Sequence, residues 1–320
     1  MNIEMINAAA TRLAPVVRRT PMLSSPFLDE IAGRRVLVKA ENLQHTGSFK
    51  FRGGWSALSG MPEAQRAKGV IAYSSGNHAQ GVAMAAAKFG VPAVILMPAD
   101  SPKLKIENTR ALGAEVVLYD RLSESREDLG AKISTDRGLT LVKPYDEPLV
   151  IAGQGTVGLE IVEQAMAEGV EKADVLIPCG GGGLTSGISI TLEGTGLRAR
   201  PCEPEGFDDA TRSLASGSRE VNATHGGSIC DAIVTNSPGE ITFPIMLKNC
   251  GSGLVVSDEE ALRAVALAYQ RLKIVLEPGG AVALAAALFR PEQITGDAVI
   301  VVATGGNVDA DVFSQSLDTL

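Results

Sequence analysis

The chain has 320 residues, of which 45% are hydrophobic and 21% charged. This composition is typical of globular proteins and excludes disordered, collagen-like and coiled-coil chains. The net charge is 29 − 37 = −8, there is no basic run, and only 4% of the residues are aromatic, which excludes a nucleic-acid-binding surface. A chain of this length forms two domains or one large one.

The sequence also argues against secretion and membrane insertion. The most apolar stretch, residues 279–289, is too short to span a bilayer, and the N-terminus carries Glu4 rather than the pattern of a signal peptide. The cysteines are scattered without a C-x-x-C pair, and the three histidines have unrelated spacings. We therefore expect a cytoplasmic protein with reduced cysteines and no His-rich metal site, and no partner that is a membrane or a nucleic acid.

Apolar runs and helical patterns alternate along the chain. Buried strands are predicted at residues 36–39, 70–73, 93–97, 116–119, 174–179 and 298–304. Helices are predicted at 78–89, 103–113 and 157–169, with stop glycines at Gly90, Gly113 and Gly169. This alternation predicts an α/β fold with open parallel sheets and helices on both faces. The tightest units predict a small domain, 65–146, inserted into a large domain formed by 1–64 and 147–320, with ligand bound in the crevice between them.

Four glycines, Gly180, Gly181, Gly182 and Gly183, follow a predicted strand and precede a helix-like segment. Free backbone N–H groups at a helix N-terminus form a cradle for an anion such as phosphate. The alternative is a flexible turn. The pattern is neither G-x-G-x-x-G nor a Walker loop, so the phosphate need not belong to a nucleotide.

Lys50 lies between Phe49 and Phe51 at the predicted start of a helix. An ordinary surface lysine is the plain alternative. In apolar surroundings at a helix N-terminus, however, its amine is more readily neutral and can attack an aldehyde to form a Schiff base.

Two further segments carry polar groups that a ligand could use. Residues 74–81, SSGNHAQG, follow a strand and offer hydroxyl, amide and backbone N–H groups to a carboxylate, although Ser75 alone also suits a helix N-cap. Residues 203–209, EPEGFDD, place carboxylates around a Pro-Gly turn. That set suits a hard divalent cation, and equally the start of a helix.

These motifs together resemble a known family. ENLQHTGSFKFRGG, SSGNHAQGVA, IAGQGTVGLEI, CGGGGLTSG, EPEGFDD, EPGGAVALAAAL and TGGNVD are similar, in family order over residues 12–310, to fold type II pyridoxal phosphate enzymes of the tryptophan synthase β-like fold. The closest resemblance is to the serine/threonine dehydratase and serine racemase branch. It implies an α/β fold with two open parallel-type sheets, pyridoxal 5'-phosphate as cofactor, an amino acid substrate and a homodimer.

The resemblance also implies roles for individual residues. Lys50 corresponds to the Schiff-base lysine, Asn77 to the partner of the cofactor's ring hydroxyl, and Thr304 to the partner of its pyridine nitrogen. The implied cofactor-binding residues are Phe49, Lys50, Asn77, Gly180, Gly181, Gly182, Gly183 and Thr304. The implied substrate-binding residues are Ser74, Ser75, Asn77, His78 and Arg126, with segment 235–239 as a further candidate wall around the β-carbon. The implied ligands of Mg, Mn or Ca are Glu203, the Phe207 carbonyl and Asp209.

The implied reaction is elimination from a β-hydroxy amino acid. The substrate amine displaces Lys50, the freed Lys50 amine removes the Cα proton, and the β-hydroxyl leaves, protonated by the cofactor phosphate. The resulting aminoacrylate hydrolyses to a 2-oxo acid and ammonia. Serine, threonine and 3-hydroxyaspartate are the candidate substrates, and either Arg126 or His78 could be the cation for a β-carboxylate.

Departures from the family pattern define the alternatives. Phe51 and Gly54 replace the more usual Ile and Ala, and Phe207 is bulkier than the usual residue there. Ser75 stands where strict L-dehydratases have Ala; opposite Lys50 it could reprotonate the carbanion, so a serine racemase is the main alternative. A cysteine synthase is less favoured, because that branch resembles T-S-G-N-T-G where this chain has Ser75-Gly76-Asn77-His78-Ala79. A nucleotide-binding or amino-acid-sensing protein on a doubly wound fold is a further alternative, but it would have no need of Lys50. Because the sequence ends soon after TGGNVD, we expect no isoleucine-binding regulatory domain.

Overall fold

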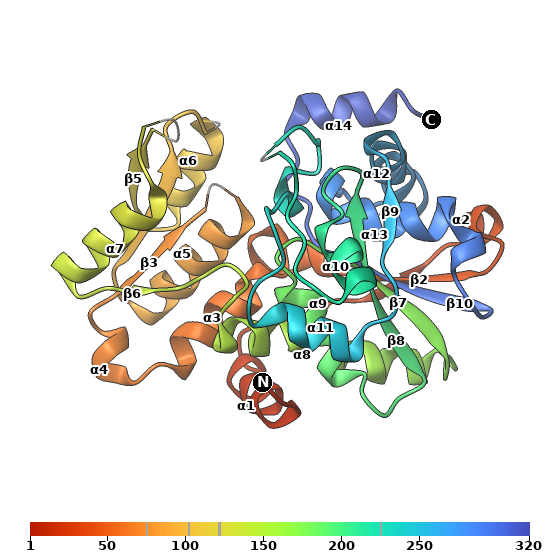
Figure 1. The fold of residues 1–320 in the computed structure, drawn as a ribbon, viewed down its shortest axis with the longest axis horizontal. Coiled ribbons are helices and arrows are strands. Elements are labelled where there is room, and N and C mark those ends of the chain that lie inside the picture. The colour runs from red at the N-terminus through yellow and green to blue at the C-terminus, as the bar shows by residue number, and fades with distance from the viewer. Residues whose placement is uncertain (75, 102, 121–122, 225) are drawn as a thin grey trace.

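The computed structural model describes residues 1–74, 76–101, 103–120, 123–224 and 226–320, which form two lobes (Figure 1). The helices are α1 Ile3–Leu13, α2 Pro26–Ala32, α3 Lys50–Gly60, α4 Glu63–Arg66, α5 Asn77–Phe89, α6 Lys103–Ala111, α7 Arg126–Arg137, α8 Pro148–Ala167, α9 Gly183–Thr191, α10 Asp209–Ser216, α11 Thr242–Asn249, α12 Asp258–Leu272, α13 Pro278–Phe289 and α14 Ala310–Leu317. The strands are β1 Met22–Ser24, β2 Arg35–Ala40, β3 Val70–Tyr73, β4 Ala93–Pro98, β5 Glu115–Tyr119, β6 Thr140–Leu141, β7 Ala173–Pro178, β8 Leu197–Pro204, β9 Leu254–Val256 and β10 Ala298–Ala303. Short 3-10 turns are η1 Glu41–Leu43, η2 His45–Gly47, η3 Asp231–Ile233 and η4 Pro291–Gln293. Within these ranges, no helix has the length and apolar character needed to cross a membrane.

Each lobe is built around its own sheet. The six-stranded sheet has the order β1-β2-β10-β7-β8-β9, in which only the edge pair β1/β2 is antiparallel. The four-stranded sheet has the order β5-β4-β3-β6 and is wholly parallel. β4, β7 and β10 are buried along their whole length, as expected for strands covered by helices on both faces. The predicted fold class is confirmed.

Parallel pairing brings the candidate motifs to one edge of each sheet. Ala303 at the end of β10 pairs with Ala40 at the end of β2, and β7 runs parallel beside β10. The loops after these strands carry Lys50, the four glycines and Thr304. In the smaller sheet β3 is followed by Ser74 and Gly76, and then by Asn77 and His78 at the start of α5. Because ligands of such sheets bind at the carboxyl ends of the strands, this edge is where a site is expected.

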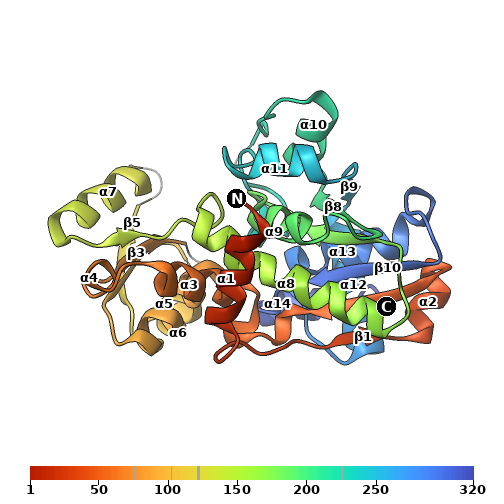
Figure 2. The same ribbon diagram turned by 90° about the horizontal axis from the view of Figure 1, so that it is seen from below.

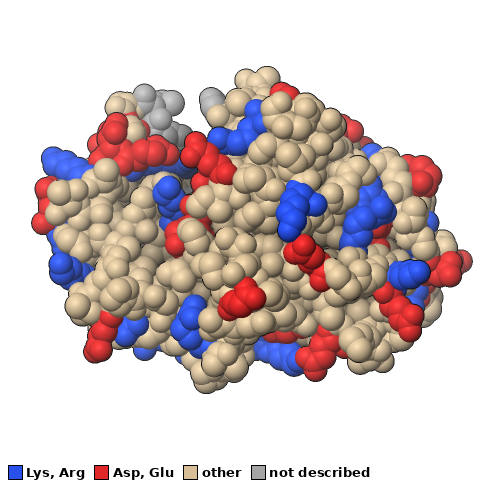
Figure 3. Space-filling view, turned by 60° about the horizontal axis from the view of Figure 1, so that its bottom comes forward, with Lys and Arg blue, Asp and Glu red and all other residues tan. Residues whose placement is uncertain are grey.

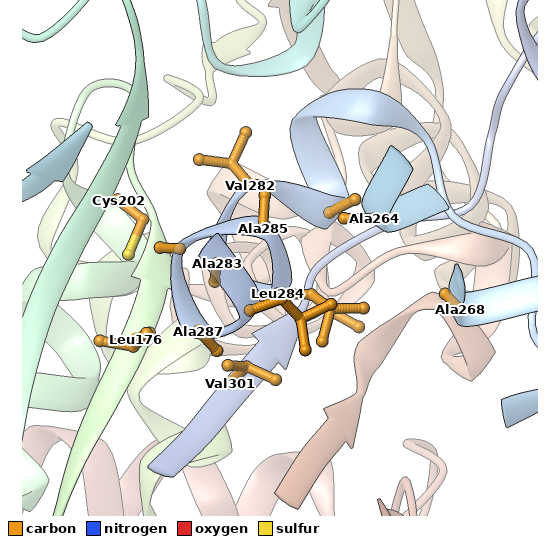
Figure 4. Close-up of a cluster of buried hydrophobic side chains, with 14 of the residues drawn as sticks. Leu176, Cys202, Ala264, Ala268, Val282, Ala283, Leu284, Ala285, Ala287 and Val301 are labelled. Carbon is orange, nitrogen blue, oxygen red and sulfur yellow. The ribbon is translucent and has the colours of Figure 1, made fainter. Parts of the chain in front are cut away.

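The most apolar stretch of the chain forms the centre of the large lobe. Every residue of α13 from Pro278 to Leu288 is buried. It packs against α12 and against strands of the large sheet, with Leu176, Cys202, Val301 and the α13 side chains in one cluster (Figure 4). A helix that is hydrophobic all round belongs in a protein core, and its many alanines allow close packing there.

Helices α3 and α5 cross at two glycines (Figure 2). A Cβ at Gly54 would lie 2.8 Å from the carbonyl oxygen of Gly81, and a Cβ at Gly81 would lie 2.8 Å from the carbonyl carbon and oxygen of Lys50. Glycine at position 54, where the family more often has alanine, thus permits this close backbone approach. The approach places the start of α3 directly against α5.

The predicted elements are present with small shifts, and four strands were not predicted. The helix predicted at 157–169 begins earlier, at Pro148, because the glycine-rich IAGQGT segment is helical. Strands β1, β6 and β9 are only two or three residues long. β8 has no continuous apolar run, because Arg198 and Arg200 interrupt it. In the structure both arginines pair with Asp174 on β7. The boundaries 65–146 of the inserted domain stay a prediction.

Candidate functional site

A cavity of about 1010 Å³ is lined by residues that follow the carboxyl ends of strands in both sheets. Its walls include most of the residues selected from the sequence. Among those lining it are Phe49, Lys50, Ser74, Asn77, His78, Arg126, Gly180, Gly181, Gly182, Gly183 and Thr304. The structure therefore brings these predicted cofactor and substrate residues together.

The charged side chains on the face seen in Figure 3 do not gather into one basic field. Acidic and basic side chains are interspersed there.

Lys50 is the first residue of α3, as predicted, and its side chain is partly buried. The Nζ atom donates a hydrogen bond to the carbonyl of Pro144 at 2.9 Å and lies 5.2 Å from the centre of the Phe49 ring. Burial lowers the pKa of Lys50 to about 8, although the Glu277 carboxylate opposes the shift. At physiological pH the amine is still mostly protonated, but its neutral form, which a nucleophile or base requires, is far more accessible than that of an ordinary lysine.

The four glycines form the predicted link between β7 and α9, and backbone conformation or close neighbours leave little room for a larger residue there. Gly182 has φ +88°. A Cβ at Gly181 would overlap the ring of Tyr145, and a Cβ at Gly180 would lie 3.0 Å from the carbonyl oxygen of Ile233. Among the described residues, the backbone N–H groups of Gly180–Gly183 donate to no acceptor. Free amides at the N-terminus of α9 are the groups that a phosphate would bind.

Asn77 is held by two residues that are distant in sequence. Its Nδ2 donates to Glu277 Oε1 at 2.5 Å, and its Oδ1 accepts from Asn307 Nδ2 at 2.7 Å. Gly305 must be glycine here, because a Cβ would overlap the Glu277 carboxylate. Burial raises the pKa of Glu277 to about 7. The side chain that the resemblance assigns to the cofactor hydroxyl is therefore held by two protein side chains.

Thr304 follows β10 and is nearly buried. Its backbone amide donates to Gly280, and its carbonyl accepts from the Phe49 amide at 3.1 Å. These bonds leave its hydroxyl available toward the cavity that Thr304 lines. A neutral hydroxyl at this position suits the predicted partner of a ring nitrogen.

The loop after β3 lies against the cavity. Ser74 Oγ accepts from the Gly76 amide, and Gly76 is the N-cap of α5. Ser75, the predicted reprotonating residue, lies outside the described residues. His78 is buried, and its Nε2 donates to the Val142 carbonyl at 2.9 Å.

Burial and the nearby Lys50 charge lower the pKa of His78 to about 3. The imidazole is therefore neutral. The alternative that His78 is the cation for a β-carboxylate is not supported by this geometry. His78 can still contribute to the site as a neutral, hydrogen-bonding side chain.

Arg126 begins α7 at the rim of the cavity. Its guanidinium pairs with Glu127 at 2.7 Å and lies 5.2 Å from the centre of the Tyr73 ring. The side chain is about half exposed. Of the two cations proposed for a β-carboxylate, Arg126 is the one that the structure leaves charged and accessible.

The predicted metal ligands lie at the end of β8 and the start of α10. Glu203 is buried and accepts hydrogen bonds from the Ala210 and Thr211 amides and from the Thr211 hydroxyl. Asp209 Oδ1 accepts from Asn222, whereas its buried Oδ2 has no partner in the described chain.

The two carboxylates repel each other. Burial raises the pKa of Glu203 to about 8 and that of Asp209 to about 6. Within the described ranges no group of three His, Cys, Asp or Glu side chains could hold a metal ion, and the predicted set has only two carboxylates with one backbone carbonyl. An unpaired carboxylate oxygen beside a second acid fits a cation with oxygen ligands.

Sequence reasoning missed several residues of the cavity. Glu277, Asn307 and Gln154 lie inside motifs that were quoted without a role, and Tyr145 was not singled out. The available signal was a lone polar residue in an apolar or glycine-rich segment, as Gln154 is within IAGQGT. The cysteines are free, as expected.

Comparisons with known proteins show the family to which the chain belongs. A family model described as pyridoxal-phosphate dependent enzyme matches residues 13–305. The L-threo-3-hydroxyaspartate ammonia-lyase of Pseudomonas sp is 43% identical over 97% of this chain and 96% of its own length. The serine racemase of Schizosaccharomyces pombe is 38% identical over 98% of this chain and 96% of its own length.

Solved structures give the same result. Maize serine racemase superposes with a TM-score of 0.91 at 33% identity, covering 99% of this chain and 97% of that one. The threonine deaminase of T.th. superposes with a TM-score of 0.90 at 42% identity, covering 97% of this chain and 99% of that one. The chain therefore belongs to the fold type II pyridoxal-phosphate-dependent enzymes, in the family of serine/threonine dehydratases and serine racemases.

Proposed function

We propose that the protein is a β-hydroxy amino acid ammonia-lyase. It converts L-serine, L-threonine or 3-hydroxyaspartate into a 2-oxo acid and ammonia, with L-threo-3-hydroxyaspartate as the preferred substrate. The observation that carries the proposal is the partly buried Lys50 amine, which lines one cavity with backbone amides of Gly180–Gly183 that have no acceptor among the described residues. An amine of lowered pKa and an anion cradle are what a phosphorylated aldehyde cofactor requires.

The described residues fit pyridoxal phosphate. Gly180–Gly183 would hold its phosphate, Asn77 its ring hydroxyl, Thr304 its ring nitrogen and Lys50 its aldehyde carbon, with Phe49 beside Lys50. When bound, the cofactor supplies an electron sink conjugated to the substrate Cα.

Lys50 is the base in this proposal. Its amine removes the Cα proton, which requires the neutral form, and a pKa near 8 makes that form accessible at physiological pH. Pro144 holds the amine through its carbonyl. The N-terminus of α5, with Ser74, Ser75, Asn77 and His78, would bind the substrate α-carboxylate.

Three groups support recognition of a polar β-substituent. Arg126 offers a positive charge at the cavity rim. Thr235 and Ser237 line the cavity, and their buried hydroxyls have no hydrogen-bond partner among the described residues. Relatives at 43% and 40% identity bear the name L-threo-3-hydroxyaspartate ammonia-lyase, which supports a substrate with a β-carboxylate.

A serine racemase is the second candidate function. The sequence has Ser75 where strict L-dehydratases have Ala, and a relative at 38% identity bears the name serine racemase. Elimination and racemisation both begin with removal of the Cα proton, so one site can perform both.

We also propose three features of the whole protein. A divalent cation, Mg, Mn or Ca, binds Glu203, the Phe207 carbonyl and Asp209. Residues 65–146 form a small domain inserted into the large one, and two chains associate as a homodimer. The unpaired Asp209 oxygen supports the first, and the cavity between two separate sheets supports the second.

The test of the function is a spectrum followed by product analysis. The purified protein should absorb in the visible band of lysine-bound pyridoxal phosphate. It should release 2-oxo acid from L-threo-3-hydroxyaspartate faster than from L-serine or L-threonine, with and without Mg. Lys50→Ala should lose the band and roughly 10³-fold or more of turnover. D-serine formed faster than 2-oxo acid would favour the racemase, and a colourless wild-type protein that releases neither would contradict both.

A further inference from the structure

Gln154 on α8 is buried in the wall of the catalytic cavity without a partner. Its side chain is only 1% exposed. Neither its Nε2 nor its Oε1 has a hydrogen-bond partner among the described residues. A buried carboxamide with both ends unpaired is costly, so a native protein normally supplies a partner. Because Gln154 lines the cavity, that partner is expected inside the cavity.

The neighbouring helix is shaped to admit this carboxamide. A Cβ at Gly53 would overlap Gln154 Nε2, and would lie 2.9 Å from Gln154 Cδ. Glycine in a helix interior weakens the helix relative to alanine. Gly53 therefore keeps open, at a cost to α3, the space that the Gln154 side chain fills.

Gly53 lies on the same face of α3 as Lys50. Residues three apart in a helix are neighbours, about 5–6 Å between Cβ positions, and helical side chains lean toward the N-terminus. The Gln154 carboxamide, which lies over Gly53, is thus one helical turn from Lys50. Both side chains line the same cavity.

The Lys50 amine has capacity for a further acceptor. A protonated lysine amine donates three hydrogen bonds, and here one is made, to the Pro144 carbonyl. The titratable groups that face Lys50 are Glu277 before α13 and His78 on α5. On α8 the nearby acid, Glu160, is already paired with Arg52 and Lys39. Gln154 is thus the neutral acceptor that α8 presents beside Lys50.

We propose that Gln154 is a positioning residue for Lys50: when its carboxamide turns toward the free Lys50 amine, its Oε1 accepts a hydrogen bond that it does not make in the orientation that the structure shows. The inference rests on the proposed role of Lys50 as base. With Pro144 and Gln154 as acceptors, one just before α8 and one on it, the amine would be held in one orientation while it takes and returns the Cα proton. An acceptor on the protonated amine also favours its charged form and so sets its basicity.

Two variants with opposite expected effects test this inference. Gln154→Met keeps the length of the side chain and removes both polar atoms, so the Lys50 pKa should fall. Gln154→Glu supplies a stronger acceptor, so the Lys50 pKa should rise. The readout is the rate at which cofactor-free protein captures pyridoxal phosphate, followed by absorbance against pH, because capture requires the neutral amine. We expect the pH of half-maximal rate to move down by about one pH unit in Gln154→Met and up in Gln154→Glu.

Turnover by the loaded enzyme should agree. In Gln154→Met the acid limb of the kcat profile should move in the same direction, and kcat should fall roughly tenfold with little change in KM. Ser56→Ala is the matched control. Ser56 is also on α3 with a buried, unpartnered hydroxyl against α8, but it does not line the cavity. Its pH profiles should match those of the wild type.

The failures are distinguishable. Unchanged capture profiles in both Gln154 variants would overturn the inference. Weaker pyridoxal phosphate binding without a pH shift would assign Gln154 to the cofactor and overturn it as well. If Gln154→Met does not fold, an upward shift in Gln154→Glu still supports the inference and its absence refutes it. If Lys50→Ala retains the cofactor band, the proposed function itself fails.

Discussion

At the scale of single residues, Glu277 determines the charge next to the cofactor site. It is the acceptor for Asn77, it lies within electrostatic reach of Lys50, and it fills space that only a glycine at position 305 leaves. Its raised pKa results chiefly from burial. The protonation state of one side chain is thus coupled to both the folding and the chemistry of the site.

Glu277→Gln should change how stability depends on pH. An acid whose pKa rises from 4.5 unfolded to about 7 folded stabilises the protein fully below pH 4.5, and this stabilisation is lost as pH rises toward 7. The full loss is on the order of 3 kcal/mol. Glutamine keeps an acceptor for Asn77 without the titration. Urea unfolding of the cofactor-free protein at pH 5 and pH 8 should show wild type losing up to that amount more than Glu277→Gln; equal losses would contradict the assignment.

At the scale of secondary-structure elements, the end of β8 and the start of α10 place two carboxylates side by side. Glu203 is satisfied by the backbone of α10, and Asp209, the first residue of α10, keeps one buried oxygen unpaired among the described residues. Asn222 connects this turn to the cavity, because its Nδ2 donates both to Asp209 and to the Thr235 carbonyl. A cation here would stabilise a wall of the cavity without contacting the substrate.

Mg²⁺ should stabilise the wild type through Asp209. A ligand at one hundred times its Kd raises the free energy of unfolding by about 2.7 kcal/mol. Asp209→Asn retains the acceptor for Asn222 but removes one charge. It should be more stable than wild type in EDTA at pH 8, where the two carboxylates repel, and should gain little from Mg²⁺. Thermal unfolding of both proteins in EDTA and in Mg²⁺ measures their stability without the cation and the increase that Mg²⁺ causes. An equal increase in wild type and Asp209→Asn would show that Mg²⁺ binds elsewhere.

At the scale of the whole molecule, α6 of the small lobe reaches residues of the large lobe. Lys105 Nζ lies 3.7 Å from Asp231 and 3.9 Å from Asp309. Lys105 and Asp231 both line the cavity between the two sheets. The exposed carboxylates make each pair weak, about 0.2–1 kcal/mol, so these pairs add only modestly to the contact between the lobes.

Lys105→Met should therefore raise KM by roughly two- to fivefold, with a smaller effect on kcat. The exposed Lys103 on the same helix provides the control, and Lys103→Met should leave KM unchanged. Added salt should raise the KM of the wild type toward that of Lys105→Met, because exposed ion pairs are screened. A salt response that persists in Lys105→Met would show that these pairs do not hold the lobes together.

The sequence by itself predicted the fold class, a glycine loop between a strand and a helix, and a lysine at the start of a helix. Buried parallel strands are continuous apolar runs, and Lys50 and the four glycines each lie in a strand-loop-helix segment whose properties are local. Glycines required by φ or by close approach, such as Gly182 and Gly54, can be noticed in a sequence, but their neighbours cannot.

Only the tertiary structure decided which distant residues meet. Asn77 and Glu277 are 200 residues apart, and Gln154 reaches the Lys50 face only because Gly53 leaves space for it. The neutrality of His78 likewise follows from its burial against Val142 and Lys50, which no local pattern encodes. Burial and long-range contacts set hydrogen-bond partners and pKa values, so the chemistry of these residues depends on packing.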